Sequence, residues 1–177
     1  MAKVFANKVV DLFPTIKNSK NKYVEIPDMV SFSLPEVTFA DGELTGAGIY
    51  GTINKPDIYS IDAMELALVV KSLNSTVRSA LTPDGVEVRL NYAVDNVNGS
   101  GTETYTSYSA VVKGYPKNIP AAEVKKGEGQ ELTINIAVRY YKLSINGKVV
   151  FEIDPLNGKM TINGKDYAKK LNKALNK

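Results

Sequence analysis

In the last third of the chain, apolar and polar residues alternate with a period of two, a pattern that suits β-strands and not helices. From Leu132 to Tyr140 almost every second residue is apolar. Such alternation places the apolar side chains on one face of a strand. The phase changes at Tyr140-Tyr141, which predicts a β-bulge there, because one extra residue exchanges the two faces. This region is therefore expected to form antiparallel sheet.

Three Asn-Gly pairs interrupt the alternation. Asn-Gly supplies the two positive φ angles that a type I′ turn needs between antiparallel strands. We therefore expect a hairpin turn at each pair, and after the first of them a strand with Val149, Phe151 and Ile153 on one face. The pairs are Asn146-Gly147, Asn157-Gly158 and Asn163-Gly164.

Earlier segments show the same periodicity. Alternating apolar residues predict a strand over residues 63–71 and a half-buried strand over residues 86–94. Between them, Asn74 or Ser75 is a suitable N-cap for a short helix that ends near Leu81.

Beyond Asp166, apolar residues spaced four apart indicate a short C-terminal helix. About seven strands with two small helices predict a mainly β fold, a two-sheet sandwich or barrel. We see no domain boundary, and we expect a single domain over residues 1–177.

The chain contains no histidine, cysteine or tryptophan. This removes the commonest general base, the commonest metal ligand and the thiolate nucleophile. We expect no cofactor, no metal and no catalytic residue, so an enzyme is the least favoured class. No apolar run approaches the ~18 residues of a membrane span, and the N-terminus has no secretory signal core. We therefore expect no membrane anchor and a cytoplasmic site of synthesis.

Residues 46–51 match the GxGxxG pattern of dinucleotide-binding sites. Such a site requires a buried strand before the motif and a helix after it. Here the motif follows the turn at Asp41-Gly42, and the nearby Pro56 opposes a helix. The glycines are better explained by positive φ angles or by close approach of the backbone.

The net charge of +3 is distributed unevenly along the chain. Residues 25–103 contain twelve acidic and four basic side chains, a charge of −8, whereas both ends of the chain are basic. Charges that are separated in sequence can also separate on the surface, where they act on charged partners.

Two segments resemble the major tail tube proteins of contractile-tailed bacteriophages. Residues 44–51, LTGAGIYG, are similar to a Gly-Ala-Gly-x-x-Gly segment of that family. Residues 124–164 resemble it more closely, through a Lys-x-Gly-Glu loop, an aromatic-x-Leu strand end, a Gly-Lys turn and a Glu-Ile-Asp strand. In this chain these are Lys125-Lys126-Gly127-Glu128, Tyr141-Lys142-Leu143, Gly147-Lys148 and Glu152-Ile153-Asp154.

The resemblance implies a structural subunit that forms hexameric rings, stacked into the rigid inner tube of a phage tail or a phage-tail-like bacteriocin. The implied partners are other copies of the chain, the sheath protein, the tape-measure protein, and baseplate or terminator proteins. Sheath contraction would drive the tube through the target envelope, and the lumen would conduct DNA, as non-specific cargo, or ions. Because phosphates bind basic surfaces strongly, the lumen is expected to be acidic or neutral.

Three sets of candidate site residues follow from this reading. The hairpins at about residues 36–70 and 104–142 are expected to line the lumen, and the basic C-terminal helix is expected to face the sheath. The lumen candidates are Glu36, Asp41, Glu43, Asp57, Asp62 and Glu65; the candidates for contact between rings are Gly46, Gly48, Tyr50, Gly51 and Lys55; and the sheath-facing candidates are Lys169, Lys170 and Lys173.

Two other functions remain open from the residues alone. A monomeric β-sandwich could bind a carbohydrate or a peptide through exposed tyrosines, which predicts a concave aromatic patch. A basic nucleic-acid binder predicts salt-sensitive binding to single-stranded oligonucleotides, with the same rings as stacking platforms. The tyrosines considered are Tyr105, Tyr108, Tyr140 and Tyr141.

Overall fold

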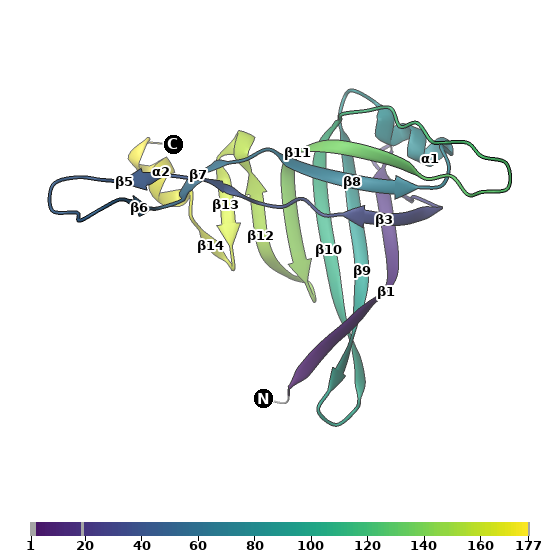
Figure 1. The fold of residues 1–177 in the computed structure, drawn as a ribbon, viewed down its shortest axis with the longest axis horizontal. Coiled ribbons are helices and arrows are strands. Elements are labelled where there is room, and N and C mark those ends of the chain that lie inside the picture. The colour runs from purple at the N-terminus through teal and green to yellow at the C-terminus, as the bar shows by residue number, and fades with distance from the viewer. Residues whose placement is uncertain (1–2, 19, 177) are drawn as a thin grey trace.

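A computed structural model describes residues 3–18 and 20–176, and most of their regular structure is antiparallel β-strand (Figure 1). The strands are β1 (Val4–Lys17), β2 (Tyr23–Glu25), β3 (Met29–Ser33), β4 (Phe39–Ala40), β5 (Glu43–Leu44), β6 (Ile53–Asn54), β7 (Asp57–Ile61), β8 (Met64–Val70), β9 (Val86–Asn98), β10 (Glu103–Pro116), β11 (Leu132–Ile145), β12 (Lys148–Asp154), β13 (Lys159–Ile162) and β14 (Lys165–Asp166). The helices are α1 (Ser75–Arg78), which a 3-10 turn at Ser79–Leu81 continues, and α2 (Lys169–Ala174).

One large sheet folds back on itself to make two layers. Its main path runs β14-β13-β12-β11-β10-β9-β1-β2. The long strand β11 changes partner along its length, because residues 132–138 pair with β8 whereas residues 141–145 pair with β12. β8 pairs in turn with β3, and Figure 1 shows these two strands crossing over β10, β9 and β1. The predicted mainly β fold is confirmed, and its two layers belong to one continuous sheet that passes between them along β11.

The core lies between the two layers and follows the predicted alternation. Every second residue of β8 is buried, and the first half of β9 shows the same pattern. Full burial of an aliphatic side chain of this size contributes about 1.5–3 kcal/mol, so these stripes hold the layers together. The buried side chains from the central strands are Met64, Leu66, Leu68, Val70, Val86, Val88, Leu90, Ala110, Val112, Leu132, Ile134 and Ile136.

Both predicted short helices are present, although the first is α-helical only to Arg78 and reaches Leu81 as a 3-10 turn. The side chain of Asn74 caps α1, where its Oδ1 accepts a hydrogen bond from the N–H of Val77 at 2.9 Å. α2 occupies the predicted place near the C-terminus. None of the helices among the described residues is long and apolar enough to cross a membrane.

Two of the three Asn-Gly pairs form the predicted turns. Asn146-Gly147 has φ angles of 48° and 76°, and Asn163-Gly164 has 49° and 78°. The prediction for Asn157-Gly158 was wrong, since positive φ occurs at Gly158 and not at Asn157. Pro155 instead begins a 3-10 turn, which its fixed φ favours, and the carboxylate of Asp154 caps this turn.

The predicted bulge in β11 is present, but it lies at Arg139, one residue before the predicted Tyr140-Tyr141. Lys113 pairs with Tyr140 and Gly114 pairs with Val138, which leaves Arg139 without an opposite residue. A second bulge lies in β12, where Val150 is the extra residue opposite Leu143 and Ser144. Val149 and Phe151 therefore do not share a face, contrary to the prediction, and Val149 is exposed.

The long strand β1 was not predicted. Two register shifts against β9 fall between Ala6 and Asp11, so the apolar residues of β1 do not follow one period. The first half of β1 leaves the body of the protein together with the hairpin between β9 and β10 (Figure 1). Bulges increase local twist, which accounts for the changed direction of this projection.

Candidate assembly surfaces

A long hairpin, residues 41–56, extends from the body of the protein past β13 and β14 (Figure 1). We call it the projecting hairpin. Its two short strands pair Glu43 with Asn54 and Leu44 with Ile53. At its base the N–H of Lys55 donates to the Gly42 carbonyl at 2.7 Å, and a Cβ on Gly42 would lie 2.5 Å from the Lys55 carbonyl oxygen. Glycine is thus required at the base by close backbone approach.

The GxGxxG motif forms the tip of the projecting hairpin. Gly48 and Gly51 have φ angles of 88° and 107°, so the predicted role of glycine in providing positive φ is confirmed at these two positions. The φ angle of Gly46 is not positive, and a Cβ at this position would have open space around it. The chain continues from the motif into strand β6, so the helix that would receive a pyrophosphate is not present at this place.

The candidates for contact between rings all lie on this exposed hairpin, at its tip and base. Tyr50 is fully exposed, at 105% of its reference area, and Leu44 and Ile53 are exposed at 47% and 51%. An apolar tip with so little cover from its own chain is suited to contact with another molecule. The five candidates, Gly46, Gly48, Tyr50, Gly51 and Lys55, are all exposed.

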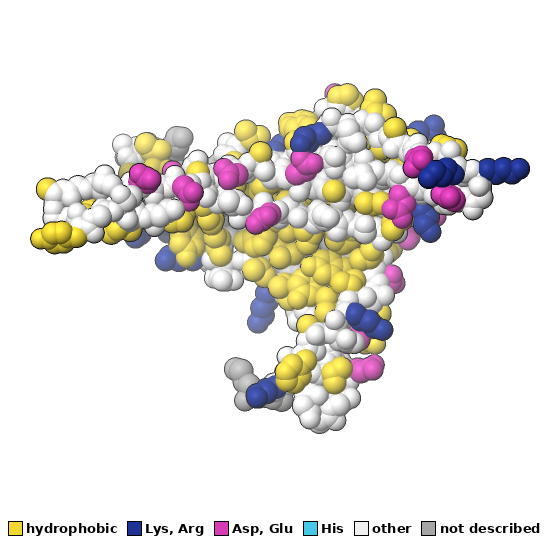
Figure 2. All heavy atoms as spheres, viewed as in Figure 1, with side chains coloured by type: hydrophobic (Ala, Val, Ile, Leu, Met, Phe, Trp, Pro, Cys, Tyr) yellow, Lys and Arg dark blue, Asp and Glu magenta, His cyan; other side chains and the backbone are white. Residues whose placement is uncertain are grey.

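The six lumen candidates are exposed as well. Figure 2 shows acidic side chains spaced in a row across the face formed by the projecting hairpin, β7 and β8. Five of the six candidates belong to this stretch, residues 41–65, and Glu36 precedes β4. Basic partners are few: Glu65 pairs with Lys117, and Lys55 is the one Lys or Arg between residues 23 and 70. This face therefore carries a negative potential.

The sheath-facing candidates Lys169, Lys170 and Lys173 are exposed on α2. The amide Nδ2 of Asn172 holds α2 near the turn between β12 and β13, with a hydrogen bond of 3.4 Å to the Gly158 carbonyl. The three lysines thus lie at the same end of the molecule as the projecting hairpin (Figure 1).

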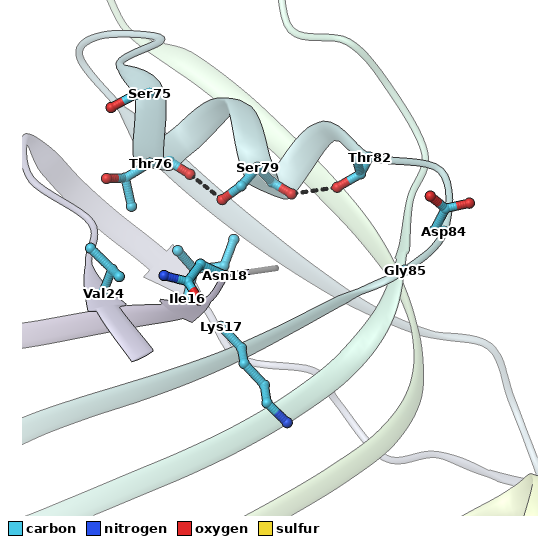
Figure 3. A pocket seen from close by; sticks show the side chains of 10 residues that line it. All are labelled: Ile16, Lys17, Asn18, Val24, Ser75, Thr76, Ser79, Thr82, Asp84 and Gly85. Carbon is cyan, nitrogen blue, oxygen red and sulfur yellow. Dashed lines mark hydrogen bonds between the residues drawn. The ribbon is translucent and has the colours of Figure 1, made fainter. Parts of the chain in front are cut away.

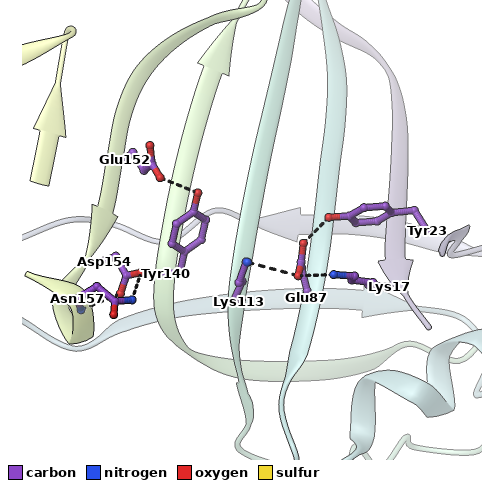
Figure 4. A network of polar contacts seen from close by, with 8 residues as sticks. All are labelled: Lys17, Tyr23, Glu87, Lys113, Tyr140, Glu152, Asp154 and Asn157. Atoms are coloured by element: carbon purple, nitrogen blue, oxygen red, sulfur yellow. Dashed lines mark hydrogen bonds and ion pairs between the residues drawn. The ribbon is translucent and has the colours of Figure 1, made fainter. Parts of the chain in front are cut away.

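A charged network occupies the outer face of the sheet, centred on Glu87 (Figure 4). Its carboxylate accepts a hydrogen bond from the hydroxyl of Tyr23 and lies 3.4 Å from Lys17 Nζ and 3.5 Å from Lys113 Nζ. Burial opposes ionisation of Glu87, but the Tyr23 hydrogen bond and the two ammonium groups outweigh it and hold the pKa below its ordinary value. The guanidinium of Arg89 stacks 4.2 Å from the Tyr23 ring centre.

A second part of the network surrounds Glu152. The hydrogen bond from Lys159 Nζ, at 2.8 Å, lowers the pKa of Glu152 against the opposing effect of burial, and Tyr140 adds a hydrogen bond of 3.1 Å. Burial and this bond to Glu152 raise the pKa of Tyr140. The two parts of the network connect through Lys113, whose Nζ lies 5.0 Å from the Tyr140 ring centre.

Three of the four tyrosines considered as stacking platforms are engaged within the protein. Tyr108 stacks on Tyr92 with ring centres 4.7 Å apart, and Tyr140 belongs to the charged network. Tyr141 is 2% exposed, and burial raises its pKa to about 12. Tyr105 remains exposed, so the four rings do not form a common platform.

An apolar groove of about 660 Å³ lies between β1 and β3. Phe32 meets Tyr92 edge-on, with ring centres 5.8 Å apart, and the Tyr92–Tyr108 stack continues the aromatic surface. Figure 2 shows this wide apolar area below the β3–β8 layer. Among the described residues that line the groove, Asp11 is the charged one, and it is acidic. The others are Val9, Val10, Leu12, Met29, Ser31, Phe32, Leu34 and Tyr92.

A second hollow of about 590 Å³ lies between α1 and the β1–β2 turn (Figure 3). Its hydroxyl groups are used locally, because Ser79 Oγ donates to the Thr76 carbonyl at 2.5 Å and Thr82 Oγ1 donates to the Ser79 carbonyl at 2.6 Å. Lys17 points away from Asp84 in Figure 3 and bonds Glu87 instead. These side chains do not converge on a common point, as a catalytic site requires.

The profile of the family "Phage tail tube protein FII" matches residues 18–175. The chain belongs to this family. It is 28% identical over 138 residues to the tail tube protein of Escherichia phage P2, an alignment that covers 77% of this chain and 80% of the relative. The tail tube family is structural rather than enzymatic, and the resemblance of this chain to tail tube proteins is confirmed.

Similar solved structures include a chain of the sheath-tube complex of an extracellular contractile injection system in its extended state. It has a TM-score of 0.48 and 12% identity, and the match covers 75% of this chain and 87% of that one. This likeness is slight, and the assignment to the tail tube family does not depend on it. The family match begins at Asn18, so the whole of β1 of this tail tube protein lies before it.

Proposed function

We propose that this tail tube protein is the subunit of the inner tube of a contractile tail, with residues 1–177 forming one tail-tube domain. Six copies form a ring, and the rings stack into a rigid hollow tube. The proposal rests mainly on membership of the tail tube family. The arrangement of the strands supports it, because β2, β3 and β14 each pair with a single strand among the described residues. Exposed edges invite pairing with other chains, and closure into a ring removes them.

The row of acidic side chains is proposed to face the lumen, which the hairpins at about residues 36–70 and 104–142 line. A DNA cargo must slide without binding, and an acidic wall repels phosphates that a basic wall would hold by counterion release. All six candidates are exposed, which is necessary for this role. A tube reconstruction that places all six on the outer wall would refute this part of the proposal.

The remaining partners follow from the same role. The lysines of α2, Lys169, Lys170 and Lys173, face the surrounding sheath protein. The tape-measure protein occupies the lumen before firing, and baseplate and terminator proteins close the two ends. The tube assembles in the cytoplasm of a bacterial host. Sheath contraction then drives it through the target envelope, where it conducts DNA or ions.

Negative-stain electron microscopy of the purified protein tests the proposal. We expect rings or tubes with a stain-filled centre, in amounts that rise steeply with protein concentration. Compact single particles at every concentration would contradict it and would favour a monomeric sandwich that binds a carbohydrate or a peptide. Unassembled protein and tubes can be separated by sedimentation before imaging.

A further inference from the structure

The apolar groove between β1 and β3 is an interior surface that its own chain leaves uncovered. β8 and β3 cover part of the inner face of β1, β9 and β10, and the cover ends at the free edge of β3. Beyond this edge the groove exposes parts of Phe32, Leu34 and Tyr92, while Val9 and Val10 are exposed at 51% and 50%. Contiguous exposed apolar surface of this kind marks a contact site.

The projecting hairpin has one apolar face. Leu44 lies opposite Ile53, so their side chains share a face, and Tyr50 stands at the tip. The bond from the Lys55 N–H to the Gly42 carbonyl extends the pairing by one step, which places Lys55 on the same face as Ile53. Glu43, Asn54 and Asp41 occupy the opposite, polar side, where Asn54 Nδ2 donates to Asp41 at 3.2 Å.

The charges of the two surfaces are complementary. Lys55 is the one cation between residues 23 and 70, and it stands beside the apolar face of the hairpin. Asp11 carries the charge among the described residues that line the groove. An apolar hairpin face with one cation therefore matches an apolar groove with one anion.

The two surfaces cannot meet within one chain. Figure 1 shows the projecting hairpin leaving the body at the end that contains β14 and α2, whereas the groove lies toward the other end, between β1 and β3. A contact between two different surfaces of identical chains is heterologous, and repetition of it builds rings or stacks.

We propose that the projecting hairpin of one copy seats in the apolar groove of a copy in the next ring, with Leu44, Tyr50 and Ile53 in the groove and Lys55 beside Asp11. This inference rests on the proposed tube, since stacked rings bring the two surfaces of different copies together. It identifies the receiving surface for the hairpin, and it explains why an aromatic interior is left open in each subunit.

Disulfide trapping tests the seating directly, because the chain contains no cysteine. The test variant combines Tyr50→Cys at the hairpin tip with Ser31→Cys, an exposed position that lines the groove. The control combines Tyr50→Cys with Ser100→Cys, which is exposed on the turn between β9 and β10. Assembled tubes of both variants are oxidised and run on denaturing gels with and without reductant.

We expect the test variant to give a ladder of covalent oligomers that reductant removes, and the control to remain monomeric. Tubes that form normally but give no more oligomer than the control overturn the seating and leave the tube proposal intact. A cross-link within one chain also overturns it. If wild-type protein forms no tubes, the proposed function itself fails, and this inference fails with it.

Exchange of the charges supplies an independent test. The side chains of Asp11 and Lys55 are both exposed, so the single variants Asp11→Lys and Lys55→Asp are each expected to fold. Each should raise the protein concentration needed for tube formation about fivefold, because like charges then meet at the contact. The double variant should return that concentration close to the wild-type value. A double variant that assembles no better than either single one contradicts the pairing.

Discussion

Gly114 of β10 lies so close to Ala137 of β11 that a Cβ on Gly114 would stand 2.1 Å from the Ala137 carbonyl oxygen. The bulge at Arg139 brings the strands together here, since Gly114 pairs with Val138 where Lys113 pairs with Tyr140. This contact lies at the point where β11 passes from β12 to β8, so it helps to set the angle between the two layers.

Gly114→Ala should therefore lower the free energy of unfolding by about 3 kcal/mol, because the added methyl group overlaps backbone that cannot move without disturbing both layers. Urea unfolding of the unassembled protein measures the change. Gly129→Ala is the matched control, since Gly129 has open space around it. Equal stability of the two variants would show that β10 and β11 are not held at this separation.

The charged network predicts a pH dependence of stability. The folded-state pKa of Glu87 lies below its ordinary value of 4.5, so its contribution is complete above that value and is lost as the pH falls through the folded-state pKa. Glu87→Gln should cost about 1–2 kcal/mol at neutral pH, as expected for loss of a charge-assisted hydrogen-bond acceptor. The difference from wild type should shrink on acidification below pH 4.5.

Unfolding free energies measured for both proteins from neutral pH to about pH 3 test this, since the other carboxylates titrate equally in each. Glu123→Gln is the control, because its side chain is 78% exposed and its pair with Lys125 lies on the surface. Parallel pH curves for wild type and Glu87→Gln would contradict the proposed ion-pair network.

The two type I′ turns offer a matched comparison. Asn146 and Asn163 have nearly the same φ, at 48° and 49°, and both precede glycine. The side chain of Asn146 also accepts a hydrogen bond of 3.0 Å from the N–H of Ser107. Asn146→Ala should therefore cost about 1 kcal/mol more than Asn163→Ala in thermal or urea unfolding. An equal cost would mean that the bond to β10 contributes nothing.

The proposed acidic lumen predicts how charge reversal changes DNA binding. Tubes carrying Asp41→Lys, Asp57→Lys and Asp62→Lys should trap short DNA during assembly and protect it from nuclease, because the wall would then neutralise phosphates. Binding should fall at least about tenfold between 50 and 200 mM salt. The control places three lysines at Glu25, Asp84 and Glu103, which are exposed and lie outside both proposed lumen hairpins. Protected DNA in the control alone would contradict the assignment of the lumen.

The parts of the fold predicted from sequence are those in which one face is buried. β8 and the first half of β9 alternate because the core covers one side of each. Asn146-Gly147 and Asn163-Gly164 were predictable because their φ angles depend on the residues themselves. Asn157-Gly158 has the same residues, but Pro155 and the capping carboxylate of Asp154 favour a 3-10 turn.

β1 could not be predicted, because its bulges break the period and much of its apolar surface is exposed in the single chain. The groove could not be predicted either, because Val9, Phe32 and Tyr92 come from three different strands. A sequence pattern shows which face of a strand is apolar, but not which part of that face stays uncovered. The hairpin tip was found through its glycines, while its apolar face depends on the pairing of Leu44 with Ile53.

Cryo-electron microscopy of tubes assembled from the purified protein can decide whether this chain is a tube subunit. We expect stacked rings of six copies around an open lumen, with acidic side chains of residues 36–65 on the inner wall and each projecting hairpin in contact with the next ring. A protein that remains a monomer under all assembly conditions, with its strand edges and apolar groove exposed to solvent, would contradict it.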